Sequence, residues 1–339
     1  MAPDDASGLE DSQMKQDPDM QLWQGRVDAA EGPLGQRWHQ IVKPLSALPA
    51  SNAQGTVALL GFACDAGVAR NHGRTGAKDG PSAIRAMLGN MPVHECKAIV
   101  DAGNVLCPAE HRDDDNGLEL AQEQLAAQLA ALLARGLFPI AMGGGHEIAF
   151  GSFGGLAAHL ATHEKVPRIG IINLDAHFDL RMSERASSGT PFRQIAEDCA
   201  ARGWPFRYCC LGVSSFANTA ALFERARQLG VNWRLDEDMG IAQMPEIQAM
   251  LAHFLAEVDH VYFTICLDVL PASVMPGVSA PAAHGVALDV VEAMVDMVCD
   301  SDKLRLADIA ELNPVYDVDH RSARVAARLL ARIANNMSA

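Results

Sequence analysis

Eight short, mostly apolar segments recur along the chain, and stretches with apolar residues at helical spacing lie between most of them. Their run-length and their content of Val, Ile, Leu and Phe are typical of buried β-strands. The segments are Val57–Phe62, Lys97–Asp101, Leu137–Met142, Arg168–Asn173, Phe206–Val213, Val231–Leu235, His260–Asp268 and Leu304–Glu311. Strands that alternate with helices predict an α/β fold whose parallel strands are joined by right-handed crossovers.

The clearest helix is predicted over Leu118–Arg135, where Leu, Ala and Gln recur at helical spacing and Gly136 follows as a C-terminal cap. Four more helices are predicted at Thr219–Gly230, Glu246–Val258, Ala287–Cys299 and His320–Asn336. The first twenty residues hold six acidic side chains against Lys15 and little that is bulky. That composition predicts a disordered acidic tail over residues 1–20, and the run Asp113–Asp115 is predicted to be a solvated loop.

Several of the apolar segments end in side chains that bind metal ions. The residues concerned are His146, Asp175, His177, Asp179, Cys266 and Asp268. Ligands in open α/β sheets bind beyond the carboxyl ends of the strands, so these side chains are expected to meet at one edge. If the chain stays extended, Cys266 and Asp268 share one face, and so do Asp175, His177 and Asp179. A set this rich in carboxylates points to manganese rather than to structural zinc.

Each of these residues also has an ordinary structural explanation. A single buried His is usually a hydrogen-bonded core residue, and Cys266 alone is more often a small buried hydrophobe. Asp268 can cap the turn before Pro271, and Glu311 can belong to a surface turn. Their coincidence at successive strand ends favours the metal site.

The overall composition narrows the class of protein. The 339 residues carry a formal net charge of −15, whereas nucleic-acid binders usually have a basic face, so no nucleic-acid partner is expected. No apolar run reaches the length that spans a bilayer, and the N-terminus lacks the pattern of a signal peptide, which predicts a soluble protein without a membrane partner. The eight cysteines show no CxxC spacing, which favours reduced thiols and a cytoplasmic location.

Four motifs together resemble the ureohydrolases of the arginase family, which includes arginase and agmatinase. The motifs are Gly143–His146, Asp175–Asp179, Cys266–Asp268 and Glu311–Pro314. The resemblance extends from about Val57 to the C-terminus. It implies a three-layer α/β/α fold around an eight-stranded, mostly parallel sheet that holds two Mn ions. Residues 21–339 would then form a single ureohydrolase-like domain.

A second group of motifs resembles the branch of this family that hydrolyses N-formimidoyl-L-glutamate in histidine degradation. These motifs are Trp23–Asp28, Gly67–Arg74, Phe178–Arg181, Ser188–Phe192 and Leu267–Pro271. The branch implies that water attacks the formimidoyl carbon of this small-molecule substrate, with glutamate and formamide as products. Members of the family often form rings or stacked assemblies, so a homo-oligomer is expected.

The resemblance also implies a role for each matching residue. The metal ligands would be His146 and Asp179 for the first ion, His177 and Asp268 for the second, and Asp175 as a bridge. Asp179 would also carry a proton to the departing amine, and Glu311 would pair with the cationic amidine-like group. Arg181, Asn71 and Arg74 would bind the substrate, since the fork of an Arg side chain can clamp a carboxylate of glutamate.

Two positions depart from the family pattern. Cys266 stands where the family has a second bridging Asp, and a thiolate is a softer ligand than manganese prefers. If Cys266 does not ligate, it leaves the second site, that of His177 and Asp268, weak, so one of the two ions is expected to bind much more weakly than the other. Phe192 stands at the position of arginase's loop His, so a His proton shuttle is not expected there, and Phe suits a substrate without a long guanidinium-bearing chain.

Two alternative functions remain open from the sequence. One is a different guanidino or amidino hydrolase of the arginase family, although Arg181 would repel the cationic end of agmatine. The other is a catalytically silent relative that binds metal, because the carboxylate expected at position 266 is missing. Function has to be argued from the site, and the other site residues are in place.

Overall fold

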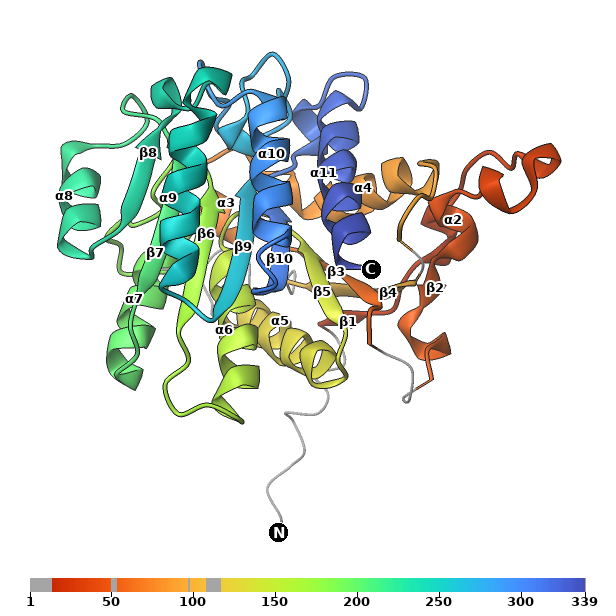
Figure 1. Ribbon diagram of the computed structural model, residues 1–339, viewed down its shortest axis with the longest axis horizontal. Coiled ribbons are helices and arrows are strands. Elements are labelled where there is room, and N and C mark those ends of the chain that lie inside the picture. Colours follow the sequence, from red (N-terminus) through yellow and green to blue (C-terminus); the bar gives the residue numbers. More distant parts are fainter. Residues whose placement is uncertain (1–13, 50–53, 97, 108–116, 339) are drawn as a thin grey trace, which may run out of the picture.

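The computed structural model describes residues 14–49, 54–96, 98–107 and 117–338. It consists of three layers, a central sheet between two groups of helices (Figure 1). The ten strands are β1 (Lys15–Gln16), β2 (Lys43–Pro44), β3 (Val57–Ala63), β4 (Ile99–Leu106), β5 (Phe138–Met142), β6 (Ile169–Leu174), β7 (Arg207–Val213), β8 (Asn232–Leu235), β9 (His260–Cys266) and β10 (Leu304–Ala310). Their order is β1-β4-β3-β5-β10-β9-β6-β7-β8, with β2 also paired to β4, and every pairing except that of β1 with β4 is parallel.

The predicted α/β fold with a mostly parallel sheet is confirmed, and each of the eight predicted strands is present as one of β3 to β10. The sheet has two further strands, β1 and β2, whose two-residue lengths leave no apolar pattern to detect. β1 lies within the stretch predicted to be disordered, yet it pairs with β4 and the preceding Met14 is buried. Residues 1–13 of that predicted tail, and the run Asp113–Asp115, lie outside the described residues.

Helices cover both faces of the sheet. One face carries α4 (Gly80–Gly89), α9 (Met244–Ala256), α10 (Leu288–Cys299) and α11 (Arg321–Met337), and the other carries α5 (Gly117–Ala134), α6 (Ile148–Ala161), α7 (Pro191–Arg202) and α8 (Ala220–Gln228). Alternate strand residues point into two apolar cores: Ile140 and Met142 belong to one core and Ala141 to the other. No helix among the described residues combines the length and the apolar character needed to cross a membrane.

The five predicted helices are present as α5, α8, α9, α10 and α11. The prediction for α5 also located its end. Gly136 has a φ of 75°, and the amides of Gly136 and Leu137 donate to the carbonyls of Leu133 and Leu132. This left-handed cap is the reason why a glycine follows the helix.

Candidate metal centre and substrate site

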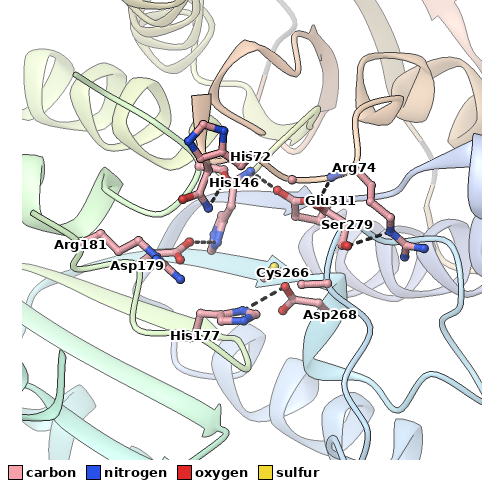
Figure 2. Close-up of a pocket in the computed structure, with 14 residues that line it drawn as sticks. His72, Arg74, His146, His177, Asp179, Arg181, Cys266, Asp268, Ser279 and Glu311 are labelled. Atoms are coloured by element: carbon pink, nitrogen blue, oxygen red, sulfur yellow. Dashed lines mark hydrogen bonds and ion pairs between the residues drawn. The ribbon is translucent and has the colours of Figure 1, made fainter. Parts of the chain in front are cut away.

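Four strands in the middle of the sheet, in the order β5-β10-β9-β6, end at the same edge. His146 follows β5 after three glycines, Glu311 follows β10, Cys266 is the last residue of β9, and Asp175 follows β6. Parallel strands bring their carboxyl ends together, so His146, Cys266 and Glu311 line one cavity of about 320 Å³ (Figure 2), and Asp175 is fully buried behind them.

Asp175 lies at the centre of the candidate metal ligands. Its Oδ2 is 3.0 Å from Nδ1 of His146, and its Oδ1 is 3.5 Å from Nδ1 of His177. Nδ1 of His146 also lies 2.9 Å from Oδ2 of Asp179, and Nδ1 of His177 lies 3.2 Å from Oδ2 of Asp268. The donor atoms therefore form two groups that share Asp175, an arrangement that fits the expected bridge between two ions.

Two buried polar atoms of this set have no hydrogen-bond partner within the described chain. They are Nδ1 of His146 and Oδ1 of Asp268. Buried polar atoms are costly unless something satisfies them, and these two lie among carboxylates where a cation would do so. Imidazole nitrogen and carboxylate oxygen are donors that suit manganese. The residues present therefore fit the two ions.

Cys266 groups with His146 rather than with His177. The thiol sulfur lies within 4.8 Å of ligand atoms of both His146 and Asp175, whereas the second group consists of Asp175, His177 and Asp268. Burial, followed by the charges of Asp175 and Asp268, raises the pKa of the Cys266 thiol well above its usual range. Any weakening by this thiol is therefore expected at the ion that His146 holds, and not at the second ion as the sequence predicted.

The chain bends at the strand ends, where the sequence pattern predicted extended backbone. β9 ends at Cys266, and a 3₁₀ turn over Leu267–Val269 carries Asp268, so the prediction that Cys266 and Asp268 share a strand face is wrong. Asp179 has a φ of 48°, so the Asp-rich motif is not extended either. Alternate residues of an extended strand stand about 6.6 Å apart, and the bends let their ligand atoms come closer.

Asp175 and Asp179 have opposite electrostatic environments. Burial acts to raise the pKa of Asp175, but the neighbouring imidazoles of His146 and His177 outweigh it and hold that pKa well below its usual range. Burial and the neighbouring Asp175 charge raise the pKa of Asp179. Two carboxyl groups whose pKa values are pushed apart can take different roles, one staying ionised and the other holding a proton.

Glu311 is held in a left-handed conformation with a φ of 73°, which is costly for a residue with a side chain. The backbone amide of His146 donates to Oε1 of Glu311 at 2.9 Å, while Oε2 is buried without a partner in the described chain. Burial, followed by the charges of Glu147 and Asp268, raises the pKa of Glu311 to about 8. With 4% of its surface exposed, Glu311 is not part of an ordinary surface turn.

Arg181 and Asn71 line the same cavity. Arg181 is exposed at its mouth, and within the described residues its guanidinium has no hydrogen-bond partner. Asn71 follows the short helix α3 (Ala66–Arg70), and its amide donates to Oγ of Ser188 at 3.1 Å. Both side chains are placed where a substrate carboxylate could reach them.

Arg74 also borders the cavity, but its guanidinium is already engaged. Its Nε donates to the carbonyl of Ser279 at 3.0 Å, and its Nη2 donates to the carbonyl of Val278. The guanidinium also lies 4.0 Å from the ring centroid of Tyr316, and Figure 2 shows it turned away from His177. These contacts indicate that Arg74 fixes the conformation of its loop, and they argue against its predicted role of binding a substrate carboxylate.

Some cavity residues were missed from the sequence, namely His72, Ser188 and Ser279. Ser188 is the first residue of the motif Ser188–Phe192, so the sequence contained a sign that it belongs to the site. Ser279 had no such signal, because its Oγ accepts from the amide of Arg74, 205 residues away. His72 has a φ of 58° and is exposed beside the ligands (Figure 2).

Phe192 does not line the cavity. It is fully buried, its ring meets the ring of His146 edge-on at 5.4 Å, and it stacks on Tyr208 at 4.4 Å. The interpretation that Phe192 shapes the substrate space is therefore not supported. Its ring instead supports the imidazole of His146 from behind.

A parallel α/β/α sheet with two overlapping His and carboxylate groups at its central strand ends defines a metal-dependent hydrolase with a binuclear site. Residues 55–335 match the Arginase family, and the chain belongs to that family.

Named relatives fall in one branch of the family. The formimidoylglutamase of Ralstonia nicotianae is 62% identical over 326 residues, which cover 96% of this chain and 98% of the relative. The formimidoylglutamase of Aeromonas hydrophila is 54% identical and covers 93% and 97%. The crystal structure of Trypanosoma cruzi formiminoglutamase with Mn²⁺ superposes with a TM-score of 0.73 at 27% identity, covering 86% of this chain and 96% of the other.

Proposed function

We propose that this protein hydrolyses N-formimidoyl-L-glutamate to L-glutamate and formamide, as a step of histidine degradation. The observation that carries the proposal is a cavity that joins a two-group metal site to the unpaired Arg181. The similarity to formimidoylglutamases over nearly the whole chain supports it. In this cavity the formimidoyl carbon of the substrate can lie at the metal site while Arg181 at the mouth binds a carboxylate of its glutamate part.

His146 and Asp179 would hold one manganese ion, His177 and Asp268 the other, with Asp175 between them. Bound ions of this kind lower the pKa of water towards neutrality and stabilise negative charge that develops during the reaction. Asp175 keeps the two groups together because each of its carboxylate oxygens faces a different histidine.

The remaining site residues account for binding and proton transfer. Oε2 of Glu311 is free to accept an N–H of the amidine group, which fixes the reacting carbon beside the ligands. Asp179, which lies beside His146 in the first group, can take a proton from the attacking water and pass it to the nitrogen that leaves with glutamate. Arg181 and Asn71 are placed for a carboxylate of the substrate.

The protein loaded with Mn²⁺ is expected to release glutamate and formamide from formimidoylglutamate and to turn over arginine and agmatine poorly. Glutamate release can be followed with a coupled dehydrogenase assay, and urea release reports the guanidino substrates. Rapid arginine hydrolysis without formimidoylglutamate hydrolysis would favour the first alternative, another family hydrolase. No turnover of any substrate by protein with full metal content would favour the silent relative.

Arg181→Ala is expected to raise KM for formimidoylglutamate about tenfold or more, the loss typical of one charge-assisted contact. Manganese content should not change, because the guanidinium of Arg181 forms no hydrogen bond or ion pair with a candidate ligand among the described residues. Arg181→Lys is the matched control, since it keeps the charge but loses the planar fork, and it should recover part of the affinity. An unchanged KM in Arg181→Ala would show that Arg181 stays in solvent during turnover.

We also propose that the two manganese ions bind with unequal affinity. The His146 group has a thiol where a bridging carboxylate would supply a hard, charged oxygen. The two groups are otherwise matched, since each has one histidine, the shared Asp175 and one further carboxylate, Asp179 or Asp268. The ion held by His146 is therefore the weaker one.

A cytoplasmic location and a homo-oligomeric state remain predictions. None of the eight cysteines forms a disulfide and all are buried, which is consistent with a reducing compartment.

A further inference from the structure

The imidazole of His146 is held from both of its nitrogens. Nδ1 faces the carboxylates of Asp175 and Asp179, and Nε2 lies 3.0 Å from Oγ1 of Thr264. Thr264 is a fully buried residue of β9, so the second nitrogen points into the sheet and away from the cavity. The tautomer of His146 therefore depends on which hydrogen bond Thr264 makes.

The donors and acceptors of His146 and Thr264 are all satisfied only if one further acceptor lies nearby. A neutral imidazole carries one N–H, so if Nδ1 binds an ion through its lone pair, the proton must sit on Nε2. Oγ1 of Thr264 must then accept, and its own hydroxyl hydrogen needs an acceptor elsewhere. Asp308 is the register partner of Thr264 on the neighbouring strand β10, and its Oδ1 is buried without a partner in the described chain.

Asp308 is otherwise hard to explain. It is fully buried, and it forms no ion pair within the described residues. The hydroxyl of Tyr262 donates to its Oδ2 at 2.5 Å, which leaves Oδ1 for the neighbouring hydroxyls of Thr264 and Ser152. Burying a carboxyl group lowers the stability of a protein, whereas an apolar residue at the same place would not. The presence of Asp308 inside the sheet therefore suggests a role other than packing.

We propose that Thr264 and Asp308 are positioning residues for the metal centre: Asp308 orients the Thr264 hydroxyl, which fixes His146 with its proton on Nε2 and Nδ1 directed at the ion. Metal-bound histidines commonly have such a partner behind them, and here a threonine links the histidine to the carboxylate. The proposal rests on the metal centre of the proposed function and not on the identity of the substrate.

The test compares Thr264→Val, which keeps the shape and removes the hydroxyl, with Thr264→Ser, which keeps the hydroxyl. Mn²⁺ affinity is measured by titration with electron paramagnetic resonance, without substrate. Thr264→Val and Asp308→Asn are expected to weaken binding of the His146 ion about tenfold to a hundredfold, while Thr264→Ser retains most of the affinity. Wild-type affinity in Thr264→Val, or an equal loss in Thr264→Ser, would overturn the proposal.

Ser152→Ala is the control, because Ser152 also neighbours Asp308 but forms no hydrogen bond with His146 among the described residues, and it should leave Mn²⁺ affinity unchanged. A measurement on the unmodified protein avoids any folding defect of the variants. In protein labelled with ¹⁵N-histidine and loaded with diamagnetic Zn²⁺, long-range ¹H–¹⁵N spectra should show His146 protonated at Nε2, and protonation at Nδ1 would overturn the assignment. Failure of the unmodified protein to bind Mn²⁺ at all would instead refute the metal centre itself.

Discussion

Asp175→Ala is expected to remove both manganese ions and to lower kcat by about 10³-fold or more, since the metal-assisted activation of water and the charge stabilisation are lost together. Asp175 alone faces both histidines, with one carboxylate oxygen towards each. Loss of any other single ligand leaves at least one group with Asp175 and a histidine. The effect on metal content should therefore be larger than that of Asp268→Ala, which touches the His177 group alone.

Metal content by elemental analysis and turnover of formimidoylglutamate check this prediction, and urea unfolding of the metal-free proteins shows whether the fold persists. The fold should persist because the strands that carry the ligands pack through apolar residues such as Ile172 and Leu174. Asp259→Ala is the matched control, since Asp259 is an exposed carboxylate paired with Arg168 and lies outside the cavity. A folded Asp175→Ala protein with normal metal content would contradict the bridging assignment.

Cys266→Asp is expected to tighten the weaker manganese site by about tenfold to a hundredfold, because it replaces a soft sulfur by a hard, charged oxygen beside His146 and Asp175. Cys266 is buried among carboxylates, with 2% of its surface exposed. A carboxylate at this position would therefore lie close enough to become a metal ligand. Calorimetric titration with Mn²⁺ resolves the two sites in each protein.

Cys266→Ser separates the two parts of this effect, since it provides oxygen without a negative charge. If charge is what the site lacks, Cys266→Ser should stay near the affinity of the unmodified protein while Cys266→Asp rises. Two equally tight sites in the unmodified protein, unaffected by Cys266→Asp, would show that Cys266 only packs in the core. In that case the two groups hold their ions without any contribution from position 266.

The sequence by itself determined the elements and the residue types of the site. The strands β3 to β10 follow from local apolar runs, and helix α5 with its Gly136 cap follows from helical spacing and the needs of a left-handed turn. The candidate ligands could also be found locally, because His146, Asp175 and their neighbours follow buried strands with groups that are costly to bury without a partner. These signals depend only on residues close together in the chain.

The tertiary structure alone decided how those residues meet. The strand order β5-β10-β9-β6 brings Asp175 to His146 and Asp268 to His177, and local periodicity does not encode which strands are neighbours. The same holds for the engagement of Arg74 by Ser279 and for the alignment of Thr264 with Asp308. Such contacts join residues far apart in the sequence, and they depend on turns at strand ends where the extended pattern stops.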